Sequence, residues 1–289
     1  MTAPAHDLVV WLRRRLERPD LTTSLLGSGT DHEVYAADDD LVVRVARTHD
    51  LARGHALVRE ASLLTYLSGR LGIAIPVPVL VDAGRGVLVC RRIAGRSLLG
   101  MGVNDPLAVA APLADALSKL HATPITLASE MAAPDPYPLP TWRDDAADTY
   151  RSIAGELPID ARRALEAFLA SPTPHEPTAI ALCHNDLGAE HLLVDPQDGR
   201  LTGIIDWSDA ALTDPCRDFA RLFRDFGPRV LERILGEYSC ELGVGSRDRI
   251  AFYARCTLIE DLAFGFEAGD RRYRDAAIAH LEHTFRRHP

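Results

Sequence analysis

The sequence predicts an α+β protein of two lobes, a small antiparallel sheet followed by a mainly helical region. The first 92 residues contain short apolar stretches separated by turns, which is the pattern of hairpins. Helical periodicity dominates after that point, and a chain of 289 residues can bury the cores of one or two domains. We therefore expect a first lobe over residues 1–92 and a second over residues 93–289.

The expected first lobe begins with an amphipathic helix and continues mainly as strands. Over Leu8–Glu17, leucine and valine recur at helical spacing with arginines between them. A second helix is expected over Ala56–Leu71, where Glu60 lies within a leucine-rich pattern. The alternation of apolar runs and turns predicts the strands Ser24–Leu26, Val34–Ala36, Leu41–Val45, Val79–Asp82 and Val87–Cys90.

The expected second lobe consists mostly of helices. Residues 121–178 hold nine of the 19 prolines, which suggests a loop-rich insertion around two helices, of the kind that shapes a binding site. The helices predicted from apolar periodicity are Leu107–His121, Trp142–Leu157, Asp160–Ala170, Pro215–Phe226, Pro228–Leu242, Arg247–Phe266 and Arg272–Arg286.

Composition and cysteine usage indicate a soluble cytoplasmic protein. Hydrophobic residues make up 47% and charged residues 25%, and no apolar run is long enough for a membrane span or a signal peptide. The five cysteines are scattered and never in C-x-x-C spacing, so we expect reduced thiols. Cys183 follows two apolar residues, and we interpret it as a core residue at the end of a strand.

The charge is unevenly distributed along the chain. Residues 1–120 hold 14 basic and 13 acidic residues, whereas residues 121–289 hold 18 basic and 28 acidic ones. A negative field concentrates cations, so we expect a cationic small molecule as partner rather than nucleic acid or an anionic sugar phosphate. The alternative is an acidic surface that only serves solubility.

Two short runs carry the chemistry. Residues 183–191 read CHNDLGAEH, and residues 203–207 read GIIDW. Transfer of a phosphoryl group needs a carboxylate facing the acceptor hydroxyl and ligands for a bridging metal ion, and Asp186, His191 and Asp206 have the residue types and the spacing for those roles. In protein kinases asparagine stands where His191 stands and D-F-G surrounds the second ligand, so the pattern favours a small-molecule kinase.

Together with residues 209–215, DAALTDP, these runs resemble the aminoglycoside phosphotransferase family, and within it the 2″-aminoglycoside and macrolide phosphotransferases. The likeness is specific over about residues 179–225. It implies a protein-kinase-like bilobal fold, ATP or GTP as phosphoryl donor and Mg²⁺ as cofactor. Asp186 would be the catalytic carboxylate and His191 and Asp206 the metal ligands, while His184 and Asp218 would support the loop.

The nucleotide is expected to bind the first lobe. Gly27, Ser28, Gly29 and Val34 match the start of a kinase glycine-rich loop, in which glycine lets the backbone approach phosphates. The chain has one lysine, Lys119, so the usual phosphate-binding lysine is missing from the third strand. Arg44 lies there instead and would pair with Glu60. The resemblance places the purine-binding hinge at residues 88–93, including Cys90 and Ile93.

The acceptor is expected to contact acids of the second lobe. The candidates are Asp209, Asp225, Glu260, Asp261 and Glu267. Several alternatives to an aminoglycoside kinase share these motifs: a macrolide kinase with an apolar cleft, a metabolic kinase of choline or sugar type, and a catalytically silent nucleotide-binding module. A metal-dependent hydrolase lacks the necessary histidine cluster. We expect a monomer or weak dimer, and the acceptor, its reacting hydroxyl and the preferred purine stay open.

Overall fold

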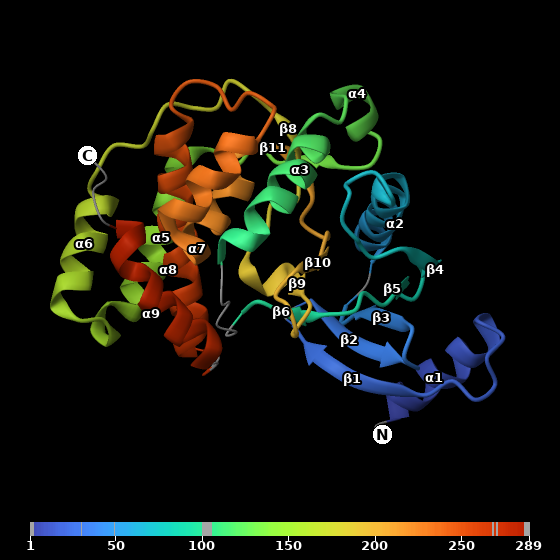
Figure 1. Ribbon diagram of the computed structural model, residues 1–289. Helices are drawn as coiled ribbons and strands as arrows, with labels where there is room; N and C mark the ends of the chain where they lie inside the picture. Colours follow the sequence, from blue (N-terminus) through green and yellow to red (C-terminus); the bar gives the residue numbers. More distant parts are fainter. Residues whose placement is uncertain are drawn as a thin grey trace. The chain divides into compact units, whose positions relative to one another are not determined.

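The computed structural model describes residues 3–29, 31–48, 50–99, 106–267, 269 and 271–285. The chain forms two compact units, one of Met1–Ser68 with Ile75–Ile93 and one of Gly69–Ala74 with Ala94–Pro289. The first is built on an antiparallel sheet and the second is mainly helical (Figure 1). The α+β class with a sheet-containing N-terminal part and a helical C-terminal part is confirmed, although residues 69–74 group with the helical unit.

The sheet of the first unit has antiparallel neighbours throughout, in the order β1-β2-β3-β5-β4. Because β5 lies between β3 and β4, both of its backbone edges are paired, and four of its five residues, Val87–Cys90, are buried. All strands expected in this region are confirmed with small shifts at their ends. They are β1 (Thr23–Ser28), β2 (His32–Ala37), β3 (Leu41–Ala46), β4 (Pro78–Asp82) and β5 (Val87–Arg91).

Two helices pack against this sheet. Trp11 and Leu12 of α1 (Ala3–Arg15) lie in one apolar cluster with Val43 of β3. Successive side chains of a strand point to opposite faces. Arg44, the residue after Val43, therefore points away from α1 and toward α2 (Leu51–Leu67). Helix α2 begins before the expected range because the side chain of Asp50 caps its first turn, and it ends before that range does, at the non-helical Ser68.

The second unit is organised around α8, which packs against α5, α7 and α9 (Figure 1). All the long helices expected from the sequence are confirmed with shifted ends, and Arg286 lies outside the described residues. The helices are η1 (Pro106–Val109), α3 (Ala110–His121), α4 (Ile125–Ala128), α5 (Leu139–Ile153), η2 (Ala154–Glu156), α6 (Ile159–Leu169), η3 (Ala189–His191), α7 (Cys216–Glu237), α8 (Ser246–Glu267) and α9 (Arg271–Phe285).

Helix α7 consists of two segments with a kink between them. Gly227 has a φ of 76°, a left-handed conformation that interrupts the helix, and Pro228 starts the second segment. The sequence suggested separate helices before and after this pair. The first segment is the one that faces the loop described below.

The second unit also contains two small sheets. Of their strands, the sequence predicted the one that ends at Cys183. The sheets have the orders β10-β9-β6 and β7-β11-β8. Their strands lie directly before and after the motif residues, so they fix both ends of each motif loop. The strands are β6 (Arg96–Ser97), β7 (Ala133–Pro134), β8 (Ala181–Cys183), β9 (Leu192–Val194), β10 (Leu201–Ile204) and β11 (Ala211–Thr213).

All five cysteines are free thiols. Cys183 is fully buried on β8, and burial raises its pKa well above the ordinary value, so the core interpretation is confirmed. Among the described helices, none has the length and apolar character needed to cross a bilayer.

Candidate active site

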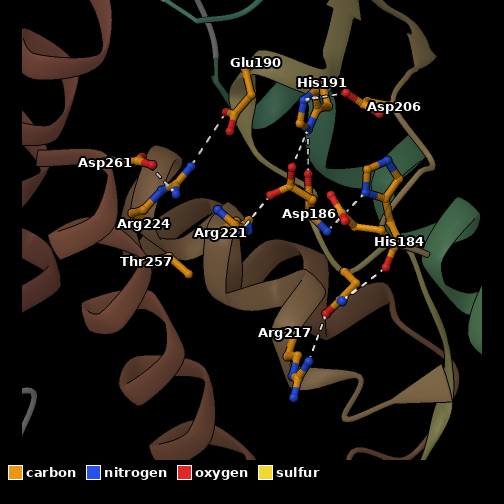
Figure 2. Close-up of polar contacts among 12 residues, drawn as sticks. His184, Asp186, Glu190, His191, Asp206, Arg217, Arg221, Arg224, Thr257 and Asp261 are labelled. Carbon is orange, nitrogen blue, oxygen red and sulfur yellow. Dashed lines mark hydrogen bonds and ion pairs between the residues drawn. The ribbon is translucent and has the colours of Figure 1, made fainter. Parts of the chain in front are cut away.

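The loop 184–191 connects β8 to β9 and carries most of the motif residues (Figure 2). His184 lies at its start with a buried ring. Its Nε2 donates to the carbonyl of Ile205 at 3.0 Å, and its Nδ1 accepts from the amide of Asp186 at 3.3 Å. Burial lowers the pKa of His184, which favours this neutral form. The ring therefore holds the two motif runs together, the supporting position expected from the sequence.

Asp218, in the first segment of α7, holds the backbone of the same loop. Its carboxylate accepts from the amides of His184 at 3.0 Å and Asn185 at 2.7 Å and from Nε2 of His121 at 3.0 Å. Asn185 has a φ of 69°, a conformation that non-glycine residues adopt only when their surroundings impose it. Burial opposes ionisation of Asp218, but the hydrogen bond from His121 and the neighbouring donors outweigh it and lower its pKa.

Asp186 is held at both carboxylate oxygens. Oδ1 lies 2.9 Å from Nη2 of Arg221, and Oδ2 lies 3.4 Å from Nδ1 of His191. Its side chain is 24% exposed, so the carboxylate still reaches the surface of the second unit. Burial opposes its ionisation, but the positive charge of Arg221 and the nearby imidazoles outweigh this and lower its pKa. Asp186 is therefore an ionised, oriented acceptor of hydrogen bonds.

The His191 and Asp206 side chains face each other, with Nε2 and Oδ2 3.7 Å apart (Figure 2). Nδ1 of His191 donates to the carbonyl of Asp186 at 2.7 Å, so Nε2 is the nitrogen that faces Asp206, as a donor in the imidazolium form or as a metal ligand in the neutral form. Burial lowers the pKa of His191, but the surrounding carboxylates of Asp186, Glu190 and Asp206 outweigh it, and the pKa is raised. Asp206 has a φ of 62°, a strained conformation typical of functional sites.

These two residues fit a divalent cation. Two ligands of one Mg²⁺ ion, each at about 2.1 Å, can be at most about 4.2 Å apart, and the separation of 3.7 Å between His191 and Asp206 satisfies this limit. Ligand atoms of Asp186, Glu190 and His191 also lie within 4.8 Å of one another, which makes Glu190 a further candidate that the sequence reasoning missed. Histidine is an uncommon partner for magnesium, so the carboxylates would supply most of the affinity for such an ion.

Arg224 connects α7 to the loop and to α8 (Figure 2). This 1% exposed arginine contacts Asp225 through Nε at 2.6 Å, Asp261 through Nη1 at 2.9 Å and Glu190 through Nη2 at 3.7 Å. Asp225 in turn accepts from the amide of Ala189 at 2.7 Å and is 5% exposed. Asp225 thus points inward, and its assignment as an acceptor contact is corrected to loop support, because its carboxylate is engaged by these internal donors.

Three of the other acids expected to contact the acceptor, Glu260, Asp261 and Asp209, have raised pKa values. Glu260 lies close enough to Arg221 and Asp186 for their charges to act on it; burial, helped by the Asp186 charge, raises its pKa. Burial also raises the pKa of Asp261 to about 7 against the opposing charge of Arg224. Desolvation by neighbouring atoms, together with the negative charge of Asp186, raises the pKa of Asp209. The pKa values of these three acids therefore depend on the arginines of α7 and on the carboxylates of the loop.

Glu267 stands apart from this group. It is exposed at the last residue of α8, and within the described residues it forms no ion pair with the loop. Its role as an acceptor contact stays a prediction without support from the geometry.

In the first unit, the hairpin between β1 and β2 carries the glycine-rich motif. Gly27 and Ser28 end β1, and Gly27 pairs with Val34 across the hairpin after an irregularity in the register. The turn is closed by the amide of Gly29, which donates to the carbonyl of His32 at 2.9 Å, and Thr30 lies outside the described residues. Contact of this turn with phosphates stays a prediction.

The expected ion pair between Arg44 and Glu60 is confirmed, with 13% and 8% of the two side chains exposed. A nearly buried arginine on β3 keeps its charge and can present further donors to a phosphate. Cys90 is buried on β5 between β3 and β4, so a purine could meet only its backbone. Ile93, two residues past the end of β5, is half-buried. The hinge role of Cys90 and Ile93 stays a prediction.

Replacing Arg44 by glutamine should raise the KM for the nucleotide about 10- to 100-fold, because a charge-assisted hydrogen bond contributes about 1.5–3 kcal/mol. Initial rates at varied ATP and GTP measure this. Arg59 is exposed on the same helix as Glu60, and Arg59→Gln is the matched control that should leave KM unchanged. An unchanged KM in Arg44→Gln would remove Arg44 from the nucleotide site.

Besides Glu190, sequence reasoning missed four residues that complete the site: His121, Arg217, Arg221 and Arg224. One signal was available in the sequence. On α7 the positions of Asp218, Arg221 and Asp225 repeat every three or four residues, which places them on one face of the helix. Arg217 belongs to the same end of α7; it contacts Asp135 at 2.5 Å and lies 5.1 Å from the ring of Trp142.

A bilobal α+β fold, with a carboxylate held beside a histidine–aspartate pair that fits a cation, defines a kinase-like phosphotransferase. The chain belongs to the phosphotransferase enzyme family, whose family model matches residues 22–253. The sequence-based resemblance to aminoglycoside and macrolide phosphotransferases is confirmed by this match and by the relatives described next.

Three relatives illustrate the similarity. Viomycin phosphotransferase of Streptomyces vinaceus is 29% identical over 211 residues, covering 67% of this chain and 70% of the relative. The structure of aminoglycoside 2'-phosphotransferase-IIIa with GDP aligns with a TM-score of 0.72 at 20% identity, covering 97% of this chain and 98% of the other. A macrolide 2'-phosphotransferase from Brachybacterium faecium aligns with a TM-score of 0.64 at 21% identity, covering 96% and 98%. The solved structures share the fold.

Proposed function

We propose that this enzyme transfers the γ-phosphoryl group of ATP or GTP to a hydroxyl of a cationic antibiotic. The observation that carries the proposal is the setting of Asp186: an ionised carboxylate, 24% exposed, held at 2.9 Å by Arg221 in the loop that also carries His191. The family supports the reaction type, and the GDP complex of a structural relative supports a nucleoside triphosphate as donor.

In the proposed reaction the acceptor hydroxyl donates a hydrogen bond to Asp186. As the hydroxyl oxygen bonds to the γ-phosphorus, the bond from that phosphorus to the β,γ-bridging oxygen breaks, and the hydroxyl proton passes to the carboxylate. The transition state is loose, so orientation of the hydroxyl matters more than early removal of its proton. His191 and Asp206 would hold Mg²⁺, which when bound neutralises charge on the phosphate oxygens.

Acids beside Asp186 support a cationic acceptor. Desolvation raises the pKa values of Glu260 and Asp209, and the negative charge of Asp186 raises them further. An ammonium or guanidinium group of an acceptor would offset this crowding of like charges. A macrolide kinase should instead present an apolar cleft beside the catalytic carboxylate, so these acids favour an amine-rich acceptor. The similarity to viomycin phosphotransferase agrees with that choice.

The test is a phosphoryl-transfer screen that identifies products by mass. ATP and GTP are each combined with Mg²⁺ and with aminoglycosides, viomycin and other peptide antibiotics, and macrolides. We expect an added phosphate on a cationic acceptor, absent with Asp186→Asn. Transfer to macrolides alone would overturn the choice of acceptor class. Nucleotide binding without transfer to any member of the panel would overturn the antibiotic proposal and favour a metabolic kinase.

A further inference from the structure

Arg221 occupies a position beside the catalytic carboxylate that the motif does not contain. It lies on the first segment of α7, one turn after Asp218, and its Nη2 is 2.9 Å from Oδ1 of Asp186 (Figure 2). The same helix holds the loop backbone through Asp218 and Asp225. The guanidinium is therefore delivered to Asp186 from the element that also anchors the loop, so its position is tied to that of the loop.

The side chain of Arg221 is neither sealed in the core nor free in solvent, since 15% of it is exposed. A guanidinium with so little access to water must be balanced by nearby acids. The charges that act on it besides Asp186 are those of Glu260 and Asp261, opposed by Arg224. The positive charge of Arg221 thus offsets the negative charges of Asp186 and of two acids of α8.

We propose that Arg221 is a positioning residue for phosphoryl transfer, which fixes the Asp186 carboxylate in the orientation that receives the acceptor hydroxyl. The inference rests on the proposed function. Rotation of the carboxylate would break its 2.9 Å contact with Arg221, whereas Nδ1 of His191, 3.4 Å from Oδ2, donates to the backbone carbonyl instead. A loose transition state gains most from such fixed geometry, because misplacement of a reacting group by about 1 Å can cost about 10²-fold in rate.

The lysine content strengthens the assignment. The chain has one lysine, Lys119, and its ammonium is 2.6 Å from Asp115 on the surface of α3. A cation beside Asp186 therefore has to be an arginine or a histidine. Arginine is suited to this place because its planar fork stays charged when partly buried and directs its donors in fixed directions.

Steady-state kinetics of three variants test the inference, with ATP as donor and viomycin and kanamycin as acceptors. Arg221→Gln should lower kcat about 10²-fold while the KM for ATP changes less than about threefold. Arg221→Lys should recover part of the loss. Arg221→Ala should be rescued by added guanidinium chloride in a saturable manner at concentrations well below those that unfold the protein. A purely structural role would give neither rescue nor a loss confined to kcat.

The matched control is Arg233→Gln, because Arg233 lies on the same helix with a side chain that is 62% exposed and paired with Glu237. It should keep the wild-type kcat and show no response to guanidinium. If the glutamine variant does not fold, Arg221→Ala measured with and without guanidinium decides, and an equal kcat in the two conditions would overturn the inference. Wild-type enzyme that phosphorylates neither acceptor counts against the proposed function, whereas active wild type with equally active Arg221→Gln counts only against this inference.

Discussion

Replacing Asp186 by asparagine should lower kcat about 10²- to 10⁴-fold and leave the KM for the nucleotide nearly unchanged. The amide cannot take the hydroxyl proton, and its NH₂ group would face Arg221 or His191 in place of one carboxylate oxygen. The nucleotide contacts assigned to the first unit are not touched by this change. Single-turnover kinetics with saturating ATP separate the chemical step from binding and from product release.

The control for this variant is Asp198→Asn, since Asp198 is 60% exposed in the turn before β10. It should be indistinguishable from wild type. A kcat in Asp186→Asn within a factor of two of wild type would show that the carboxylate is not the acceptor of the hydroxyl proton. The reaction would then depend neither on a base nor on a negative charge at this position.

Replacing Asp218 by asparagine should destabilise the second unit by about 3–5 kcal/mol. The carboxylate is fully buried and accepts from the amides of His184 and Asn185 and from the ring of His121. Asparagine keeps one acceptor oxygen, and its NH₂ group meets donors that then have no acceptor. Thermal and urea denaturation of wild type and variant measure the change, and kcat should fall with it because the loop loses its anchor.

Asp148→Asn is a suitable comparison, because Asp148 is 71% exposed on α5 beside Arg151. Surface ion pairs of this kind contribute little, so its free energy of unfolding should change by less than about 0.5 kcal/mol. A loss of stability in Asp218→Asn no larger than in Asp148→Asn would mean that the hydrogen bonds of Asp218 do not hold the loop.

The local part of the site could be predicted from the sequence. Asp186 and His191 are five residues apart in one loop, and Asp206 follows a short strand that pairs with the strand after this loop. Residue type and spacing are sufficient when so few residues separate the groups. The strands of the first unit were equally clear, because turn residues mark their ends.

Contacts between distant segments could not be predicted in this way. His121 meets Asp218 across 97 positions of sequence, and nothing in the pattern of α3 distinguishes this histidine from a surface residue. Asp225 was placed on the acceptor side because it is acidic, but the direction of its side chain depends on how α7 packs against the loop. The strands β6 and β7 have two residues each, too few for periodicity to be recognised.

The single lysine has a consequence for how this enzyme can be found. Acyl phosphate derivatives of ATP label many kinases by acylating the lysine next to the bound phosphates. The residue that we expect at that place is Arg44 on the third strand, and a guanidinium does not lose the proton that acylation requires. The remaining target, Lys119, is paired with Asp115 in the helical unit. A proteome-wide survey based on lysine acylation would therefore overlook this phosphotransferase, and a dicarbonyl reagent selective for arginine is the appropriate probe.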